Sequence, residues 1–301
     1  MKVLVTGASG LIGRALCDAL FARGDHVVGL TRDPSRARSA NPRVTWHKWE
    51  PMLERPDPAA FEGVEGVIHL LGERIDQKWT DEAKRKIMES RRQGTHNLVG
   101  TIESLQTPPK VLVSQSGVGH YGDRGDEVVD ESDGPGDSFD ARVTQAWEAA
   151  AHELDSSPVR VVVVRTGQVL AREGGMLKEM LPPFKLGVGG PIAGGEQYLA
   201  WIHIDDEVGI LLWALDNEKV SGTINAASPN PATNKDFSKA LGRALNRPAV
   251  MPVPGLVLDL KFGREFGQVL RGGQRVIPKR TQELGYQFRY PDLDEALSDL
   301  V

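Results

Sequence analysis

The chain has 301 residues, and at about 100–200 residues per domain this length predicts one large domain or two smaller ones. Its 36 basic and 41 acidic residues give a net charge of -5, which argues against nucleic acid as a partner, and its one cysteine, Cys17, excludes an intramolecular disulfide. No apolar run approaches the ~20 residues that cross a bilayer, and the first residues lack the order of a secretory signal, so we expect a cytoplasmic protein with no membrane partner.

Short apolar runs alternate with helical patterns along the first half of the chain. Strands are predicted at residues 2–6, 26–31, 44–49, 66–71, 111–114 and 159–165. Helices are predicted at residues 11–23, 81–105 and 141–155, the last with Asp137 or Ser138 as its N-cap. The strand runs are rich in Val, Ile and Leu without alternation, which is typical of strands covered on both faces. The pattern therefore predicts an α/β fold with a doubly wound parallel sheet, the Rossmann arrangement.

The regular alternation ends after residue 166. Glycines and prolines crowd residues 182–195, a strand is predicted at 201–204, and Asp205 is expected to cap a helix that runs to 215. One more sheet strand is predicted at 223–226, and short helices separated by prolines follow from residue 229. We expect a larger nucleotide-binding domain of residues 1–166 and 200–228, and a smaller, discontinuous substrate-type domain of residues 167–199 and 229–301.

A glycine-rich turn, Thr6-Gly7-Ala8-Ser9-Gly10-Leu11-Ile12-Gly13, joins the first predicted strand to the first predicted helix. Glycines at steps of three allow a tight turn, close approach of a pyrophosphate and close packing of the helix. The helix N-terminus in turn attracts the charge of the phosphate. A strand before the turn and a helix after it are the context of a dinucleotide site, and an ordinary glycine-containing turn is the alternative.

The end of the second strand indicates which dinucleotide is expected. An NAD site has an acidic residue about 20 residues after the glycines, whereas an arginine there suits the 2′-phosphate of NADP. The sequence offers Thr31 and Arg32, with Arg36 one turn further on. We therefore predict NADP(H) as the cofactor. Asp33 directly follows Arg32 and weakens this assignment slightly, and the alternative is that Arg32 is a solvated surface charge.

Further motifs resemble the extended short-chain dehydrogenase/reductase superfamily. They are Val67 to Gly72, Ser114-Gln115-Ser116 before Tyr121-Gly122, and Trp201 to Asp206. Lys78-Trp79-Thr80, Ser90-Arg91, Trp147-Glu148 and the tail from Gly273 to Pro291 narrow the resemblance to a nucleotide-sugar-epimerase-like family that ends in a domain of unknown function. The resemblance covers nearly the whole chain. It implies NADP contacts from Gly7, Gly10, Leu11, Ile12, Arg32, Leu70, Leu71, Gly72, Ser114 and Arg165.

The catalytic pattern of that superfamily is incomplete here. Its redox members use a tyrosine four residues before a lysine, and none of the four tyrosines of this chain has a lysine at that position. Glu148 resembles the superfamily's glutamate four residues after the lysine, which puts Thr144 at the lysine position and Asp140 at the tyrosine position. An aspartate near its reference pKa of ~3.9 accepts a proton but cannot donate one unless burial raises that pKa.

Ser116 and Asp140 are therefore the catalytic candidates. Ser116 is expected to hydrogen-bond a substrate hydroxyl or carbonyl, and the alternative is a serine that ties down its own loop. Asp140 is expected to replace the tyrosine in proton transfer.

The remaining polar and aromatic candidates have simpler interpretations. His69, His120 and His203 are expected to be packing residues, and no metal is predicted because their spacing matches no metal site. Trp79 and Trp201 would close either a substrate pocket or a core. A polar cluster in the C-terminal third would meet an anionic substrate or form a solvated face. Its members are Arg271, Gln274, Arg275 and Lys279.

Two functions remain open from the sequence. The first is an NADP(H)-dependent, epimerase-like protein or oxidoreductase that acts on a hydroxyl/ketone pair of a small polar substrate. The second is an NADP(H)-binding regulatory module without turnover. Superfamily relatives commonly pair two helices into a four-helix bundle, which implies a homodimer through residues 81–105 and 141–155. The basic surface of the first helix keeps a monomer as the alternative.

Overall fold

The computed structural model describes residues 1–301, and its centre is a seven-stranded parallel sheet in the order β3, β2, β1, β4, β5, β7, β11. Strand β1 pairs with both β2 and β4, so the strand order reverses there and opens a crevice at the carboxyl ends of the strands. This confirms the predicted doubly wound α/β fold. The strands are β1 (Lys2–Thr6), β2 (His26–Thr31), β3 (Thr45–Lys48), β4 (Gly66–His69), β5 (Val111–Gly117), β7 (Arg160–Thr166) and β11 (Gly222–Ala226).

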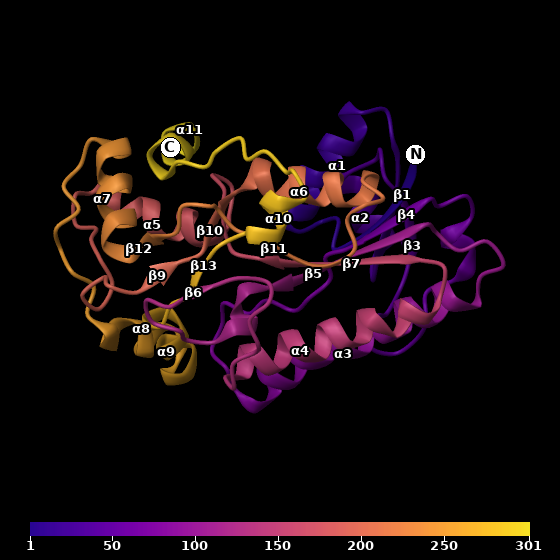
Figure 1. Cartoon of the computed structure of the whole chain (residues 1–301), viewed down its shortest axis with the longest axis horizontal. Helices are drawn as coiled ribbons and strands as arrows, with labels where there is room; N and C mark the ends of the chain where they lie inside the picture. Colours follow the sequence, from indigo (N-terminus) through magenta and orange to yellow (C-terminus); the bar gives the residue numbers. More distant parts are fainter.

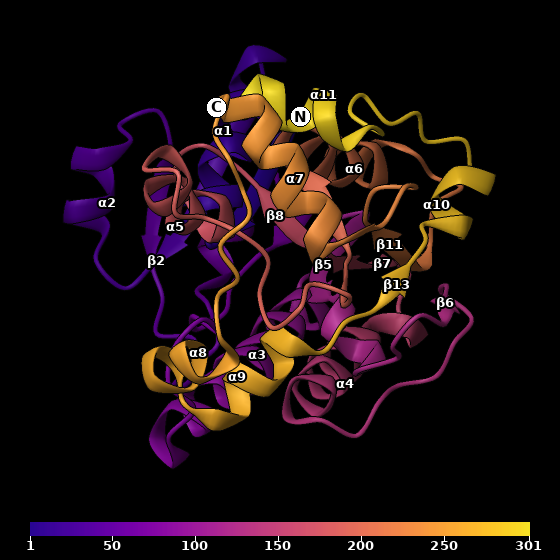
Figure 2. The same ribbon diagram turned by 90° about the vertical axis from the view of Figure 1, so that its left-hand side faces the viewer.

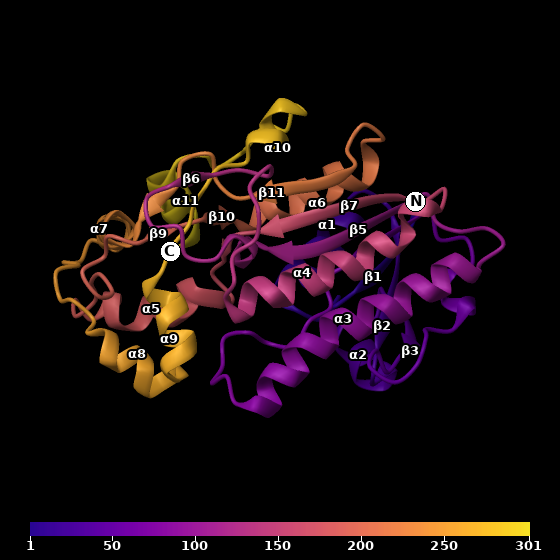
Figure 3. The same ribbon diagram turned by 60° about the horizontal axis from the view of Figure 1, so that its bottom comes forward.

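Two layers of helices cover the sheet (Figures 1 and 3). Helices α1 (Leu11–Ala22) and α6 (Ile204–Asp216) pack on one face, and α3 (Asp81–Ser104) and α4 (Phe139–Ala151) pack on the other. Apolar side chains on both faces of the strands are buried under these helices, as the continuous Val and Leu runs predict. None of the helices combines the length and the apolar character that a bilayer crossing requires.

Some helix and strand ends agree with the prediction, and others differ from it. Ser138 caps α4, as one of two expected residues, because its side chain accepts from the amide of Ala141. The cap of α6 is His203 rather than Asp205, since the imidazole accepts from the Asp205 amide at 3.0 Å. Strand β5 continues three residues further than predicted, which carries Ser116 into the strand.

A smaller unit lies at the carboxyl end of the sheet (Figure 2). Buried side chains of α5 (Gly175–Lys185), α7 (Asn234–Leu245) and α11 (Leu293–Leu300) share an apolar core, which Trp201 also joins. The insertion after β7 and the C-terminal third thus pack together, whereas the exact domain limits stay a prediction. The other helices are α2 (Pro34–Ala40), α8 (Gly255–Phe262), α9 (Arg264–Arg271) and α10 (Lys279–Glu283), with 3-10 turns η1 (Pro58–Phe61), η2 (Val118–Tyr121) and η3 (His152–Ser156).

Short strand pairs tie the smaller unit together and to the larger one. The parallel pair is β8 (Gln168–Leu170) with β10 (Trp201–His203), and the antiparallel pair is β9 (Tyr198–Leu199) with β12 (Ala232–Thr233). The C-terminal strand β13 (Arg275–Val276) pairs with β6 (Val128–Val129), which follows η2. Through that last pair the chain after α9 is held beside the loops that follow β5.

Candidate functional site

Two glycines without room for a side chain shape the loop between β1 and α1. Gly7 has a φ of +67°, and a Cβ there would lie 2.8 Å from the carbonyl oxygen of Leu70. A Cβ on Gly13 would lie 2.2 Å from the carbonyl oxygen of Gly7. The amide of Gly10 closes the turn by donating to that same oxygen at 2.9 Å. The loop is therefore tight, and α1 packs directly against it, as the glycine spacing predicts.

The first turn of α1 presents backbone amides to the crevice side of the loop. No side chain caps the helix at Gly10, and the amides of Leu11, Ile12 and Gly13 have no acceptor in the protein. Free amides at the positive end of a helix dipole form an anion site. The loop and these amides together fit the pyrophosphate of a dinucleotide.

Arg32 follows β2 at the carboxyl edge of the sheet, one strand away from the loop. The guanidinium groups of Arg32 and Arg36 are exposed, and neither has an ion-pair partner. The carboxylate of Asp33 caps α2 by accepting from the Arg36 amide at 3.0 Å, while the Asp33 amide donates to Oγ1 of Thr31 at 3.3 Å. The one acidic residue beside Arg32 is thus engaged in capping. Two cations remain free for a phosphate.

Residues 70–72 continue from the carboxyl end of β4 beside the glycine-rich loop. The amide of Leu70 donates to Oγ1 of Thr6 at 3.1 Å, which fixes the segment to β1. His69 ends β4 and is fully buried between the hydroxyls of Thr6 and Thr95, at 2.7 and 2.9 Å. Burial lowers the pKa of His69 to about 3, so its ring is a neutral packing group, as the sequence predicts.

Arg91 of α3 holds the far end of that segment, a role that sequence reasoning missed. Its Nη1 donates to the carbonyl oxygen of Glu73 at 2.9 Å, and its guanidinium lies over the ring of Trp147. A Cβ on Gly72 would lie only 2.7 Å from Cζ of Arg91. Burial lowers the pKa of Arg91 to about 10. The pair Ser90-Arg91 served only as a family signature, and nothing in it indicated this contact.

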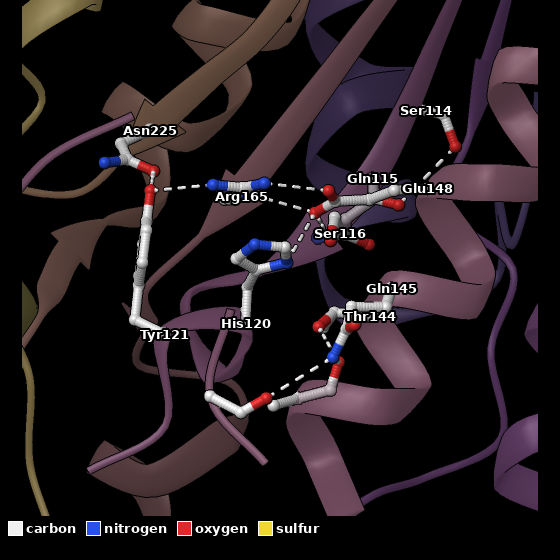
Figure 4. A network of polar contacts seen from close by, with 12 residues as sticks. Ser114, Gln115, Ser116, His120, Tyr121, Thr144, Gln145, Glu148, Arg165 and Asn225 are labelled. Carbon is white, nitrogen blue, oxygen red and sulfur yellow. Dashed lines mark hydrogen bonds and ion pairs between the residues drawn. The ribbon is translucent and has the colours of Figure 1, made fainter. Parts of the chain in front are cut away.

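A buried ion pair between Glu148 and Arg165 lies at the centre of a polar network (Figure 4). Nε and Nη2 of Arg165 donate to the two carboxylate oxygens of Glu148, each at 2.9 Å. Ser116 donates to Oε1 of Glu148 at 2.6 Å. Nη1 of Arg165 donates to the Tyr121 hydroxyl at 3.1 Å, and that hydroxyl donates to Oδ1 of Asn225 at 2.8 Å. The network links β5, β7, β11 and α4.

The charges of this network are fixed at neutral pH. Burial by itself raises the pKa of Glu148, but the bonds from Arg165 and Ser116 outweigh it and hold that pKa below its usual range. Burial raises the pKa of Tyr121 to about 12. His120 lies 3.6 Å from Glu148, and burial lowers its pKa to about 4. One carboxylate and one guanidinium are therefore charged, and the tyrosine and histidine are neutral.

Two residues with expected roles toward substrate and cofactor have partners within the protein, and those expected roles stay predictions. Ser116 is 4% exposed, and its hydroxyl donates to Glu148. The guanidinium of Arg165 is buried against Glu148 and Tyr121. Ser114 is also buried, with the Gln115 carbonyl as its nearest acceptor at 3.5 Å. Ser116 and Arg165 therefore stabilise the ends of β5 and β7.

Asp140, the residue expected to replace the tyrosine, lies in the first turn of α4. It is 5% exposed, and its Oδ1 has no hydrogen-bond partner. Burial raises the pKa of Asp140 despite the opposing bonds from Ser138 and from backbone amides. The direction of this pKa shift is the one that proton donation by an aspartate requires. Thr144, at the lysine position, donates to the carbonyl oxygen of Ala141 at 2.8 Å and offers no cation.

A cavity of about 310 Å³ opens beside Asp140, between α4 and the smaller unit. The loop after η2, the end of α9 and residues 272–274 form its other walls. Trp79 and Phe139 meet edge to face there, with ring centroids 4.9 Å apart. Trp79 thus lines a cavity and also packs in a small core, and its contact with a substrate stays a prediction.

The polar cluster expected in the C-terminal third does not form a site. Gln274 lines the cavity, but Arg271 donates to Asp259 at 2.7 Å instead. Arg275 lies over the ring of Tyr198, and Lys279 pairs with Asp130 at 3.2 Å. The four residues are close together in the sequence, and their spacing could not show that each has a different partner.

The fold and the glycine-rich loop define a dinucleotide-binding protein of the Rossmann type. The model of the NAD dependent epimerase/dehydratase family matches residues 3–227, and a domain of unknown function (DUF1731) matches residues 253–300. The chain belongs to the NAD dependent epimerase/dehydratase family. This confirms the family resemblance seen in the sequence.

Known proteins resemble the chain over its full length. Human epimerase family protein SDR39U1 is 40% identical over 309 residues, with 100% of both chains covered. The crystal structure of the human protein (isoform 2) with NADPH has a TM-score of 0.90 at 37% identity, covering 100% of this chain and 99% of that one. A nucleoside-diphosphate sugar epimerase from Corynebacterium glutamicum has a TM-score of 0.80 at 31% identity, covering 100% of this chain and 58% of that one.

Proposed function

We propose that the chain binds NADP(H) across the glycine-rich loop and acts as an epimerase-like protein or oxidoreductase on a hydroxyl/ketone pair of a small polar substrate. The observation that carries the cofactor assignment is the pair of free guanidiniums at the end of β2, beside a loop with unpartnered amides. A human relative that is similar over the whole chain was crystallised with NADPH, which supports the same choice here.

Removing Arg32 is expected to weaken NADPH binding and to leave NADH binding unchanged. A charge-assisted bond from a guanidinium to a phosphate contributes about 1.5–3 kcal/mol, or roughly 10- to 150-fold in affinity. Calorimetric titration of Arg32→Ala against both cofactors measures this difference. Arg38→Ala is the matched control, because Arg38 is an exposed arginine of the adjacent helix. Equal losses for NADPH and NADH would contradict the role of Arg32.

The chain's own residues divide the work of binding and proton transfer. When bound, NADPH supplies a hydride to a carbonyl carbon. The loop amides and Arg32 hold the phosphates, while Arg91 fixes the segment that follows β4. Asp140, whose pKa burial raises, gives its proton to the substrate oxygen in reduction and takes it back in oxidation.

Asp140→Asn is expected to separate binding from turnover. A positioned proton-transfer group contributes about 10²- to 10⁴-fold, so nicotinamide absorbance with a panel of ketones and nucleotide sugars should show a loss of at least about 10²-fold. NADPH affinity should stay within about twofold, because no cofactor phosphate contacts Asp140 in this proposal. Asp137→Asn, an exposed carboxylate two residues before α4, is the control. Undiminished turnover in Asp140→Asn would place the proton transfer elsewhere.

A regulatory NADP(H)-binding module is the second candidate function. The observation that favours it is the engagement of Ser116 with Glu148, together with the missing tyrosine and lysine. Absence of turnover in the unmodified protein across the panel, with intact NADPH binding, would favour this module over the enzyme.

The homodimer through α3 and α4 also stays a prediction. Light scattering separates it from the monomer, whose mass is 32.8 kDa. Several outward-facing residues of α3 are charged and paired, such as Glu82 with Lys86 and Glu89 with Arg92. The two chains of such a dimer would therefore meet through a polar surface. A light-scattering mass equal to that of a single chain at micromolar concentration would reject the dimer.

A further inference from the structure

Most of the large apolar side chains that remain exposed lie on one end of the smaller unit. Seven of the eleven in the chain belong to residues 175–191 and 234–262, which together we call the end surface. The seven are Leu186, Val188, Val250, Met251, Leu256, Val257 and Leu260. Single exposed apolar residues are ordinary, whereas a group of them on one surface marks a site of interaction.

Backbone hydrogen bonds hold the segments of the end surface side by side. The amide of Met251 donates to the carbonyl oxygen of Gly189 at 3.2 Å, and the amide of Val253 donates to that of Pro191 at 2.8 Å. The chain after α7 therefore runs beside the chain after α5, and it leads directly into α8. Figure 2 looks onto this end of the molecule, where α7, the connecting segment and α8 follow one another from top to bottom. The exposed apolar residues thus belong to neighbouring segments.

The end surface is also basic, in a chain whose net charge is -5. Its two segments contain seven basic and three acidic residues. Glu179 pairs with Lys261 at 3.0 Å. Asp259 pairs with Arg271 at 2.7 Å, and Asp236 lies in the first turn of α7, where the helix dipole stabilises its charge. All three acidic residues are therefore compensated, and positive charge remains in excess.

Four cations of the end surface have no ion-pair partner. They are Lys178, Lys185, Lys239 and Arg247, and all four are exposed. Nε of Arg247 donates to the carbonyl oxygen of Lys185 at 3.0 Å, which brings these two residues together next to the exposed Leu186. Free positive charge and exposed apolar side chains thus occur on the same surface.

An open hollow of about 440 Å³ lies at the end of α7. Lys239, Arg243 and Arg247 line it together with Val250, and no carboxylate belongs to its lining. Arg243 is paired with Asp294 at 2.7 Å, so the other two cations stay free for an anion. A phosphate attached to an apolar chain fits such a hollow, because its charge would meet the cations and its chain would meet the apolar residues beside them.

Two other kinds of partner match the end surface less well. A second copy that pairs about a two-fold axis would put the same basic residues opposite each other, and like charges across an interface are unfavourable. Hot spots between proteins are rich in Trp and Tyr and poor in Leu and Val, and none of the exposed large apolar residues here is aromatic. An anionic bilayer requires only protruding apolar groups beside cations.

We propose that the end surface docks on a bilayer that contains anionic lipids. Its most exposed leucines, Leu186, Leu256 and Leu260, are 67–78% exposed and enter the boundary between headgroups and acyl chains. Lys239 and Arg247 hold a lipid phosphate in the hollow. The expectation of no membrane partner rested on the lack of a segment long enough to span a bilayer, and a surface contact requires no such segment.

The test is sedimentation of the whole protein with two kinds of vesicle, one of phosphatidylcholine alone and one of equal parts phosphatidylcholine and phosphatidylglycerol. We expect the protein to bind the anionic vesicles at least about tenfold more tightly than the neutral ones, because several cations attract them. Added salt should weaken this binding, since it screens the charges at the surface. No binding to the anionic vesicles would overturn the proposal.

A double variant removes the apolar contribution. Leu256→Ser together with Leu260→Ser should weaken binding to the anionic vesicles at least about tenfold, because two apolar side chains no longer leave water on docking. Leu53→Ser is the matched control, since Leu53 is 83% exposed and lies on the larger unit. It should bind as the unmodified protein does.

A second double variant removes the basic contribution. Lys239→Gln together with Arg247→Gln should weaken binding at least about tenfold, because both cations lie at the hollow. Arg38→Gln together with Lys110→Gln removes the same charge from exposed positions of the larger unit. Equal losses in these two double variants would show attraction to the charge of the whole protein and would overturn the docking surface.

A fluorescent label reports which surface meets the bilayer. The single cysteine, Cys17, is buried, so a cysteine introduced at an exposed position can be labelled alone. With a polarity-sensitive dye on Leu260→Cys, we expect the emission to shift to the blue on addition of anionic vesicles. The same dye on Leu53→Cys should not shift. Equal shifts at the two positions, or no shift at position 260, would contradict the proposed orientation.

The same variants reveal the other two kinds of partner. A light-scattering mass that rises with protein concentration, and returns to that of one chain in the double variant of Leu256 and Leu260, would identify a second copy. Binding to polyglutamate without binding to the anionic vesicles would identify an acidic protein. Either result would overturn the proposal of a bilayer.

Discussion

Replacing Arg165 with alanine is expected to lower the free energy of unfolding by about 3–5 kcal/mol. Removal of one partner of a buried ion pair leaves the other charge without compensation, and that cost is far larger than the net value of the pair. Glu148 would keep only the bond from Ser116 at 2.6 Å and the neutral His120 at 3.6 Å. The Tyr121 hydroxyl would also lose a donor.

Urea denaturation compares this variant with a surface pair. Arg243 and Asp294 form an exposed ion pair, with side chains 60% and 53% exposed. Because exposed pairs contribute about 0–1 kcal/mol, Arg243→Ala should change the free energy of unfolding by less than about 1 kcal/mol. A loss in Arg165→Ala no larger than in Arg243→Ala would contradict the assignment of Arg165 to a buried pair.

The second large effect concerns Glu207, which is fully buried in α6. Oγ1 of Thr166 donates to its Oε1 at 2.9 Å, but Oε2 has no partner. Burial raises the pKa of Glu207 from 4.5 to about 8, against the smaller opposing effect of Thr166. A group with a raised pKa binds its proton more tightly in the folded state. Its contribution to stability is complete below about pH 4.5 and is lost as the pH rises through about 8.

Glu207→Gln should therefore remove a pH-dependent loss of stability. The pKa difference corresponds to a loss on the order of 4–5 kcal/mol between about pH 5 and pH 9 in the unmodified protein, relative to the glutamine variant. Denaturation of both proteins over this range isolates the effect, because all other groups titrate in both. If the free energies of unfolding of the two proteins changed with pH in the same way, Glu207 would not be buried in its protonated form.

The fold follows from local sequence patterns. Runs such as residues 161–164 are apolar at every position, and they alternate with amphipathic segments, so a parallel sheet covered on both faces was predictable. The glycine-rich loop was also predictable, because its glycine spacing between a strand and a helix is itself a local pattern. Gly7 has a φ of +67°, and a Cβ on Gly13 would meet the carbonyl oxygen of Gly7, so these two requirements are local.

The polar network was not predictable, because its contacts join distant parts of the chain. Tyr121 and Asn225 are 104 positions apart, and they meet only because β11 pairs with β7 and β7 pairs with β5. Sequence motifs identified Ser116 and Arg165 as special residues but not as partners of Glu148. A motif gives the type of residue at a site, whereas strand order decides what it touches.

The position of Asp140 could be predicted from the sequence, but its burial could not. Its place at the tyrosine position came from the spacing to Glu148, and the condition for proton donation was burial. That burial depends on long-range packing, since the cavity walls include residues 272–274 from the far end of the chain. No pattern near residue 140 contains this information.

The most direct test of the account is a crystal structure of this protein with NADPH. We expect the 2′-phosphate to lie about 3 Å from the guanidinium of Arg32 and the pyrophosphate to accept from the amides of Leu11 and Ile12. A 2′-phosphate directed away from β2, or a cofactor bound outside the glycine-rich loop, would contradict the proposed NADP(H) site.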